Sequence, residues 1–168
     1  FGLALGSFLN VLIDRLPRGE NIVWTRSHCD YCHKTLRWWE LIPLFSFVFL
    51  QARCRRCHKR LSFQYPLIEL ASGVGLTLLA SFIGLADPIR FILSVVVAAT
   101  LLVITVSDTK YQIIPDEMVL VGFVSAFAYR ILYSGEIVTS VATAIASAAF
   151  FYFLWMVTRG VGMGLGDV

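Results

Sequence analysis

The sequence predicts an all-α polytopic membrane protein, a bundle of transmembrane helices with a small cytoplasmic module that holds four cysteines. Hydrophobic residues make up 58% of the 168 residues, compared with roughly 45 to 50% in a soluble domain, and the mean hydropathy is +0.76. Ten of the 14 Lys and Arg residues lie between Arg15 and Arg60. Because loops rich in Lys and Arg stay in the cytoplasm, this segment is predicted to be cytoplasmic.

Residues 1–17 are predicted to form the first transmembrane span, which Pro17 ends. The stretch before Asp14 is apolar and crosses most of a bilayer, and we expect it to be truncated at its start, as part of a longer protein. Asn10 and Asp14 are four residues apart and share one helix face, which we expect to be turned toward protein or the cytoplasmic edge. Small residues that allow close helix packing are Gly2, Gly6 and Ser7.

Residues 18–64 contain two Cys-x-x-Cys pairs separated by 21 residues. This spacing is typical of a four-thiolate zinc site. We expect a structural zinc, because four protein ligands leave no open position and so short a segment buries too little surface to fold unaided. Two disulfides, which a reducing cytoplasm disfavours, and four free thiols are the alternatives. The predicted ligands are Cys29, Cys32, Cys54 and Cys57, and the adjoining His28, His33 and His58 could replace one of them.

The basic residues of this module are interleaved with Trp24, Trp38 and Trp39, a pattern that could also suit a nucleic acid. Beside a membrane, attraction to anionic lipid headgroups explains the charge more simply. We therefore expect the lipid bilayer as a partner, and no nucleic acid. Residues 41–50 are strongly apolar but too short to span a bilayer, and they are predicted to form a short buried or membrane-surface element.

Residues 65–168 are predicted to form the transmembrane core, truncated after a glycine-rich loop. Counting crossings from the cytoplasmic module places Asp108 and Asp167 on the same, cytoplasmic side. Lys110 and Arg159 fall on that side too, so that twelve of the 14 basic residues are inside, as the positive-inside rule requires. The apolar runs predict four further spans, over 66–86, 89–107, 118–133 and 137–157.

Asp108 and Asp167 are the candidate catalytic pair. Each follows an apolar run, and acids at a membrane edge are costly enough to be candidates for function. Two carboxylates within a few ångströms share one proton, so that one acts as general base on a water and the other as general acid. Gly164 and Gly166 have no side chains and would let a substrate backbone come close. The alternative is a flexible glycine loop with a solvated acid.

Other chemistries remain open for these acids. Paired membrane acids could instead bind ions or relay protons in a zinc-stabilised transporter or scaffold. Asp116 is interpreted as a helix N-cap, and Asp14 and Glu69 as partners between helices or at the membrane edge. The sequence contains no His-Glu-x-x-His or Gly-x-Ser-x-Gly motif that would supply a competing hydrolytic site.

Five motifs occur in order along essentially the full chain. They are Gly6-Ser7-Phe8-Leu9-Asn10-Val11 with Arg15-Leu16-Pro17, the two cysteine pairs, Tyr65-Pro66-Leu67-Ile68-Glu69, Asp108 with Ile114-Pro115-Asp116, and Met163-Gly164-Leu165-Gly166-Asp167. Together they resemble the motifs of the type IV prepilin peptidases, the prepilin leader peptidases/N-methyltransferases of the GxGD aspartic protease family. The four-cysteine module argues against an archaeal-type preflagellin peptidase or a presenilin-like peptidase, which share GxGD.

The resemblance implies an intramembrane aspartic endopeptidase of the bacterial inner membrane, with Asp108 and Asp167 as its catalytic pair. Its substrates would be type IV prepilins or type II secretion pseudopilins, cut on the cytoplasmic side after a glycine. Many members then methylate the new N-terminus with S-adenosylmethionine, although no glycine-rich nucleotide loop marks a site for it here. Leu41 and Ala52 stand where the family often has Asn and Gly, which bears on the methyltransferase and not on the protease acids. Formation of a homo-oligomer is left open.

Overall fold

The computed structural model describes residues 1–168 except 23, 25, 30, 134, 136 and 159–168. In these described residues the regular structure is helical, with isolated β-bridges and no strand, which confirms the all-α prediction. The helices are α1 (Gly2–Arg15), η1 (Leu16–Arg18), η2 (Trp38–Leu41), α2 (Phe45–Phe49), α3 (Gln64–Ile83), α4 (Pro88–Tyr111), α5 (Asp116–Tyr133) and α6 (Ile137–Thr158), where η marks a 3-10 helix.

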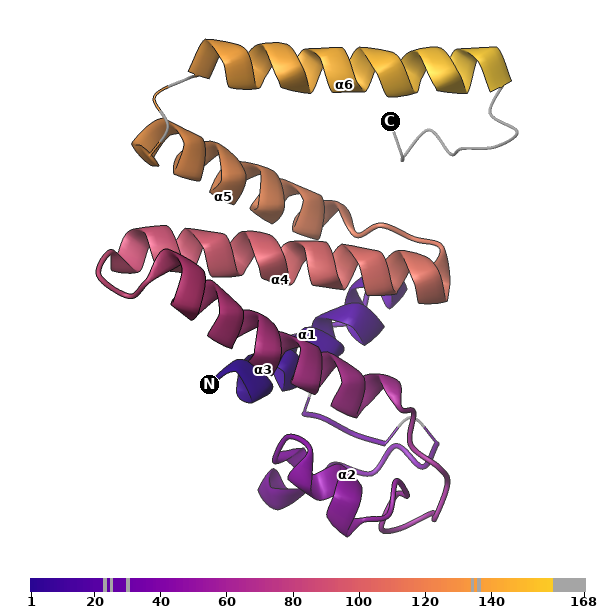
Figure 1. Cartoon of the computed structure of the whole chain (residues 1–168). Coiled ribbons are helices and arrows are strands. Elements are labelled where there is room, and N and C mark those ends of the chain that lie inside the picture. The colour runs from indigo at the N-terminus through magenta and orange to yellow at the C-terminus, as the bar shows by residue number, and fades with distance from the viewer. Residues whose placement is uncertain (23, 25, 30, 134, 136, 159–168) are drawn as a thin grey trace.

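The long helices form a stack in which α6 lies on α5, α5 on α4, and α4 on the pair α1 and α3 (Figure 1). The segment with the cysteines and α2 lies on the far side of α3 (Figure 1). The buried core is formed where three helices meet, and its apolar side chains are Leu9, Leu12 and Ile13 of α1, Ile68 of α3 and Val103 of α4. Helix α1 is therefore central to the packing although it is short.

Three of the described helices, α3, α4 and α6, are long and apolar enough to cross a membrane, whereas the sequence predicts five spans. Helix α1 has 14 residues, about 21 Å at about 1.5 Å per residue, which is less than a hydrocarbon core of about 30 Å. Helix α5 has 18 residues but carries Asp116, Glu117 and Arg130. The spans predicted over residues 1–17 and 118–133 fall on α1 and α5, and they stay predictions.

Helix α4 continues beyond the predicted span 89–107 and ends at Tyr111. Asp108 therefore lies in the last turn of a helix and not in the loop after it, which corrects the predicted boundary. No Gly or Pro interrupts this turn, and the positive charge of Lys110 is favourable at the negative end of the helix dipole. The helix stops where Gln112 adopts a left-handed conformation (φ 54°) and its N–H donates to the carbonyl of Asp108 at 2.9 Å.

Gly6 lets α1 and α3 come into close contact. A methyl group added at Gly6 would lie 2.6 Å from Glu69 Cα and 2.9 Å from Ile68 O, and it would also overlap Ser72 Oγ. The Ser72 hydroxyl donates to the carbonyls of Ile68 and Glu69, at 2.8 and 3.0 Å. Because backbone atoms and a bonded hydroxyl cannot move aside cheaply, a side chain at this position would push the two helices apart.

Gly6→Ala is expected to destabilise the protein by about 1 to 3 kcal/mol, the usual range for an overpacked site. Thermal or denaturant unfolding of the purified protein in detergent measures the change. Gly75→Ala is the matched control, because a methyl group at Gly75 meets nothing within 4 Å and alanine is the better helix former. Equal stability of the two variants would show that the close approach at Gly6 contributes nothing.

Candidate functional site

The four cysteines of the two Cys-x-x-Cys pairs come together in one cluster. The sulfur atoms of Cys29, Cys32, Cys54 and Cys57 all lie within 4.8 Å of one another. Cys29 and Cys54 are buried, and all four are free thiols. The sulfur atoms of Cys29 and Cys57 are 3.8 Å apart, and a tetrahedral ion with sulfur ligands at about 2.3 Å holds them about 3.8 Å apart. The geometry suits a thiophilic metal ion and contains neither of the disulfides considered from the sequence.

The two cysteine pairs are built in the same way. In the first, the N–H of His33 donates to the carbonyl of Cys29 at 2.8 Å, and the N–H of Cys29 donates to the carbonyl of Lys34 at 3.1 Å. In the second, the N–H of His58 donates to the carbonyl of Cys54, and the N–H of Cys54 donates to the carbonyl of Lys59, at 2.9 Å each. An isolated antiparallel bridge closes each loop, His28 with Thr35 and Arg53 with Arg60. Each of these two similar turns thus contributes two thiols to the same cluster.

The surroundings of the cluster shift two of its thiol pKa values in opposite directions. Burial raises the pKa of Cys29 to about 12. The N–H of Cys57, donated to the sulfur of Cys54, lowers the pKa of the Cys54 thiol to about 7. A bound cation would favour the thiolate form of every ligand.

The histidines next to the cysteines are not part of the cluster. In the part of the chain that the structure describes, the group that could hold a metal consists of the four cysteines alone. His28 Nδ1 lies 3.2 Å from the carbonyl of Arg26, and the rings of His28 and His33 are 5.8 Å apart. The expectation that a histidine could replace a cysteine is therefore not met by this geometry.

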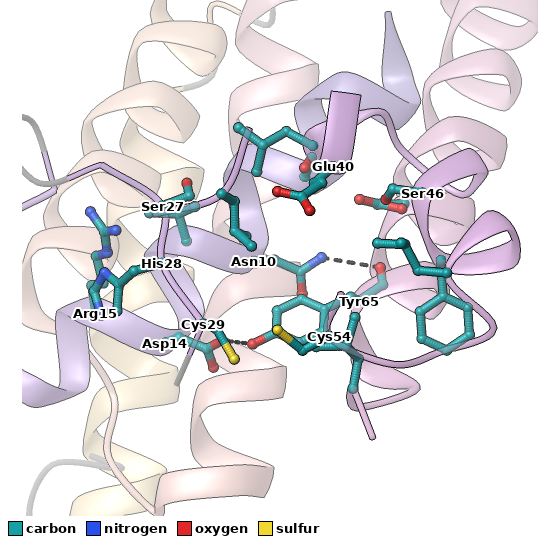
Figure 2. Close-up of a pocket in the computed structure, with 18 of the residues that line it drawn as sticks. Asn10, Asp14, Arg15, Ser27, His28, Cys29, Glu40, Ser46, Cys54 and Tyr65 are labelled. Atoms are coloured by element: carbon teal, nitrogen blue, oxygen red, sulfur yellow. Dashed lines mark hydrogen bonds between the residues drawn. The ribbon is translucent and has the colours of Figure 1, made fainter. Parts of the chain in front are cut away.

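A cavity of about 180 Å³ separates the cysteine cluster from α1 and α3. Figure 2 shows Asn10, Asp14 and Tyr65 at this cavity together with the sulfur atoms of Cys29 and Cys54. The amide of Asn10 donates to the carbonyl of Tyr65 at 3.1 Å. Asp108 is not among the residues that line this cavity, so the cavity and the candidate catalytic residue are separate features.

Asp14 and Glu69 lie between packed elements, as the sequence predicts. The carboxylate of Glu69 is buried and accepts the N–H of Leu44 at 2.8 Å, which ties the start of α2 to α3. The carboxylate of Asp14 accepts from Tyr65 of α3 and from Lys110 and Tyr111 of α4. The shared face of Asn10 and Asp14 is thus turned toward protein. The three partners of Asp14 are not found by sequence reasoning, because two of them lie more than ninety residues away.

Asp108 is exposed in the last turn of α4. Its carbonyl accepts from the backbone N–H and the side-chain amide of Gln112, at 2.9 and 2.8 Å. Asp116 is the first residue of α5, where a carboxylate is favourable at the positive end of the helix dipole. Asp167, Gly164 and Gly166 lie outside the described residues, so the pairing of Asp108 with Asp167 stays a prediction.

Two family models match the chain. Residues 1–83 match the bacterial peptidase A24 N-terminal domain, and residues 95–168 match the type IV leader peptidase family. The first match includes the cysteine cluster, and the second includes Asp108 and the glycine-rich end of the chain.

Curated relatives cover nearly the whole chain. A type 4 prepilin-like proteins leader peptide-processing enzyme of Escherichia coli O78:H11 is 32% identical over 99% of this chain and 70% of its own length. Prepilin leader peptidase/N-methyltransferases of Bacillus subtilis and Myxococcus xanthus are 34% and 31% identical, over 100% and 99% of this chain and 67% and 50% of their own lengths. The chain thus spans about half to two thirds of such relatives. No solved structure matches the chain.

Proposed function

Because this chain belongs to the type IV leader peptidase family, we propose that the full-length protein cleaves the leader peptides of type IV prepilins or type II secretion pseudopilins. Asp108 and Asp167 are the proposed aspartic pair, with Gly164 and Gly166 in the adjoining loop. The observation that carries the proposal is the match of both parts of the chain, cysteine module and core, to one peptidase family.

The arrangement of the helices supports this pairing. Asp14 contacts both Tyr65 at the start of α3 and Lys110 at the end of α4, so the module and Asp108 lie at the same end of the bundle. Helix α6 ends at Thr158 toward that same end (Figure 1). The segment that contains Asp167 follows α6 in the sequence.

The proposed reaction uses water as the nucleophile. The ionised carboxylate of the pair takes a proton from a water molecule, whose oxygen attacks the carbonyl carbon of the scissile peptide bond. The protonated carboxylic acid donates a hydrogen bond to the carbonyl oxygen and then a proton to the leaving amine. The bond between that carbon and the amide nitrogen breaks, and the leader is released with a carboxylate at its end.

We further propose that the cysteine cluster binds one structural zinc ion and that the cluster and both aspartates face the cytoplasm from the bacterial inner membrane. Four sulfur ligands leave no position for water or substrate, so the metal would stabilise the fold and take no part in hydrolysis. The concentration of basic residues between Arg15 and Arg60 supports the cytoplasmic side, because such segments are retained there.

N-methylation of the cleaved pilin is a second proposed activity. It is supported by the names of the relatives from Bacillus subtilis and Myxococcus xanthus, which are described as peptidase/N-methyltransferases. S-adenosylmethionine is the proposed methyl donor.

One experiment tests both activities and separates them from the transporter or scaffold alternative. The full-length protein is incubated in detergent or liposomes with a purified prepilin, with and without S-adenosylmethionine, and the product is weighed by mass spectrometry. We expect the pilin to lose the mass of its leader, and to gain the mass of one methyl group only when the donor is present. An intact prepilin would remove the peptidase proposal, and a cleaved, unmethylated product in the presence of the donor would remove the methyltransferase.

A further inference from the structure

One carboxylate joins three helices at the end of the bundle that lies next to the cysteine module. Oδ1 of Asp14 accepts from Lys110 Nζ at 2.6 Å and from the Tyr111 hydroxyl at 3.0 Å, and Oδ2 accepts from the Tyr65 hydroxyl at 3.0 Å. The side chain of Asp14 is only 13% exposed. Figure 2 shows the carboxylate of Asp14 pointing at the ring of Tyr65. Hydrogen bonds to an ionised acceptor are shorter and stronger than neutral ones.

Two of these donors are the last two residues of α4. Lys110 and Tyr111 follow Asp108 in the same final turn, and final turns of helices fray when nothing holds them. The carbonyl of Asp108 is itself part of the helix end, because it accepts from Gln112. Fraying of this turn would therefore move Asp108 together with its backbone.

Arg15, the residue after Asp14, contacts the cysteine module. The guanidinium of Arg15, which is buried, donates to the carbonyl of Asn21 at 3.1 Å and to that of Arg26 at 3.3 Å. Arg18, just beyond α1, also donates to the hydroxyl of Tyr111, at 3.2 Å. The end of α1 thus contacts the module on one side and the last turn of α4 on the other.

We propose that Asp14 is a positioning residue for Asp108: by holding Lys110 and Tyr111 against α1 and α3, it keeps the last turn of α4 helical and Asp108 in one place. The inference rests on the proposed function in that it treats Asp108 as catalytic. Asp14 acts without touching the substrate, and its effect passes through the backbone of α4.

The test compares variants of the full-length protein in the prepilin cleavage assay. Asp14→Asn keeps the size of the side chain but removes its charge and one acceptor. Because small misplacements of a reacting group are costly, kcat should fall about tenfold to a hundredfold, with KM close to that of the wild type. Asp14→Glu, which keeps the carboxylate, should recover most of the lost kcat.

Asp87→Ala is the matched control, because Asp87 is an aspartate that stabilises the opposite end of the same helix. Its carboxylate accepts the N–H groups of Ile89 and Arg90, at 3.1 Å each. Removing this cap should lower the melting temperature and leave kcat unchanged. If Asp14→Asn has the kcat of the wild type, the positioning role is wrong. It is also wrong if Asp87→Ala loses as much kcat as Asp14→Asn when the two variants lose the same amount of melting temperature.

Hydrogen–deuterium exchange gives a readout that does not depend on activity. In Asp14→Asn the amides of residues 109–113 should exchange at least several times faster than in the wild type, and in Asp87→Ala they should not. If the wild-type protein fails to cleave prepilin, the proposed function fails, and unchanged exchange in this turn would still overturn the inference separately. Should Asp14→Asn not fold, Tyr111→Phe, which removes one of three donors, must show the same local increase in exchange.

Discussion

Replacing Asp108 by asparagine is expected to lower the rate of leader cleavage by about 10²- to 10⁴-fold, the usual contribution of a general acid or base. An amide has nearly the size of a carboxylate but can neither take a proton from water nor give one to the leaving amine. Asp167→Asn should have the same effect, because neither member of a proton-sharing pair can work alone. Both variants should remain folded and inserted in the membrane.

Asp116→Asn is the matched control for these substitutions. Asp116 begins α5 and follows Asp108 by eight residues in the sequence. Asparagine keeps the size of its side chain and loses only a charge whose interaction with the helix dipole is weak at an exposed position. Its cleavage rate should stay within a few-fold of the wild type. Initial rates with a purified prepilin measure the effect, and the melting temperature of each variant reports folding. If Asp108→Asn or Asp167→Asn cleaves at nearly the wild-type rate, the aspartic pair is misassigned.

Loss of the metal is expected to unfold the cysteine module. Structural zinc binds zinc-finger peptides with apparent free energies of about 10 to 16 kcal/mol. Because the unfolded chain rarely contains a preformed site, this binding free energy stabilises the folded state. Cys54→Ser removes a buried thiol that is one of the four proposed ligands, and a strong chelator should produce the same state in the wild type. Limited proteolysis within residues 18–64 should become rapid in both cases, while the transmembrane helices stay protected.

Elemental analysis of the purified protein decides whether the metal is there at all. We expect about one zinc ion per chain in the wild type, a greatly reduced content in Cys54→Ser, and an unchanged content in His58→Ala. His58 is the control because it adjoins Cys57 in the sequence but is absent from the sulfur cluster. A metal-free wild-type protein that is folded and resists proteolysis would rule out the structural role.

The cysteine cluster could be predicted from the sequence because both pairs have the same short spacing. A Cys-x-x-Cys turn brings its two thiols together wherever it occurs, so only the meeting of the two turns depended on the fold. The sequence could predict that another helix packs closely on Gly6, because Gly6 is a small residue in an apolar helix. It could not predict that Ser72 lies against it.

The end of α4 was harder to predict because its boundary depends on weak local preferences. The apolar run stops at Ser107, yet the helix continues through Asp108 to Tyr111, since charged and polar residues at a helix end cost little. The contacts of Asp14 with Lys110 and Tyr111 also favour this last turn. Nothing in the sequence near Asp14 indicates those partners.

By itself the sequence determined the helical bundle, the apolar membrane-spanning helices and the two cysteine pairs, because transfer of apolar side chains from water and the spacing of residues within one turn act inside a single segment. Only the tertiary structure decided that the carboxylate of Asp14 accepts hydrogen bonds from Lys110, Tyr111 and Tyr65, and that α1 lies at the centre of the core. Such contacts depend on the angle and register at which two helices cross. Many crossings bury similar apolar area, and the choice among them is made by the fit of all the helices together.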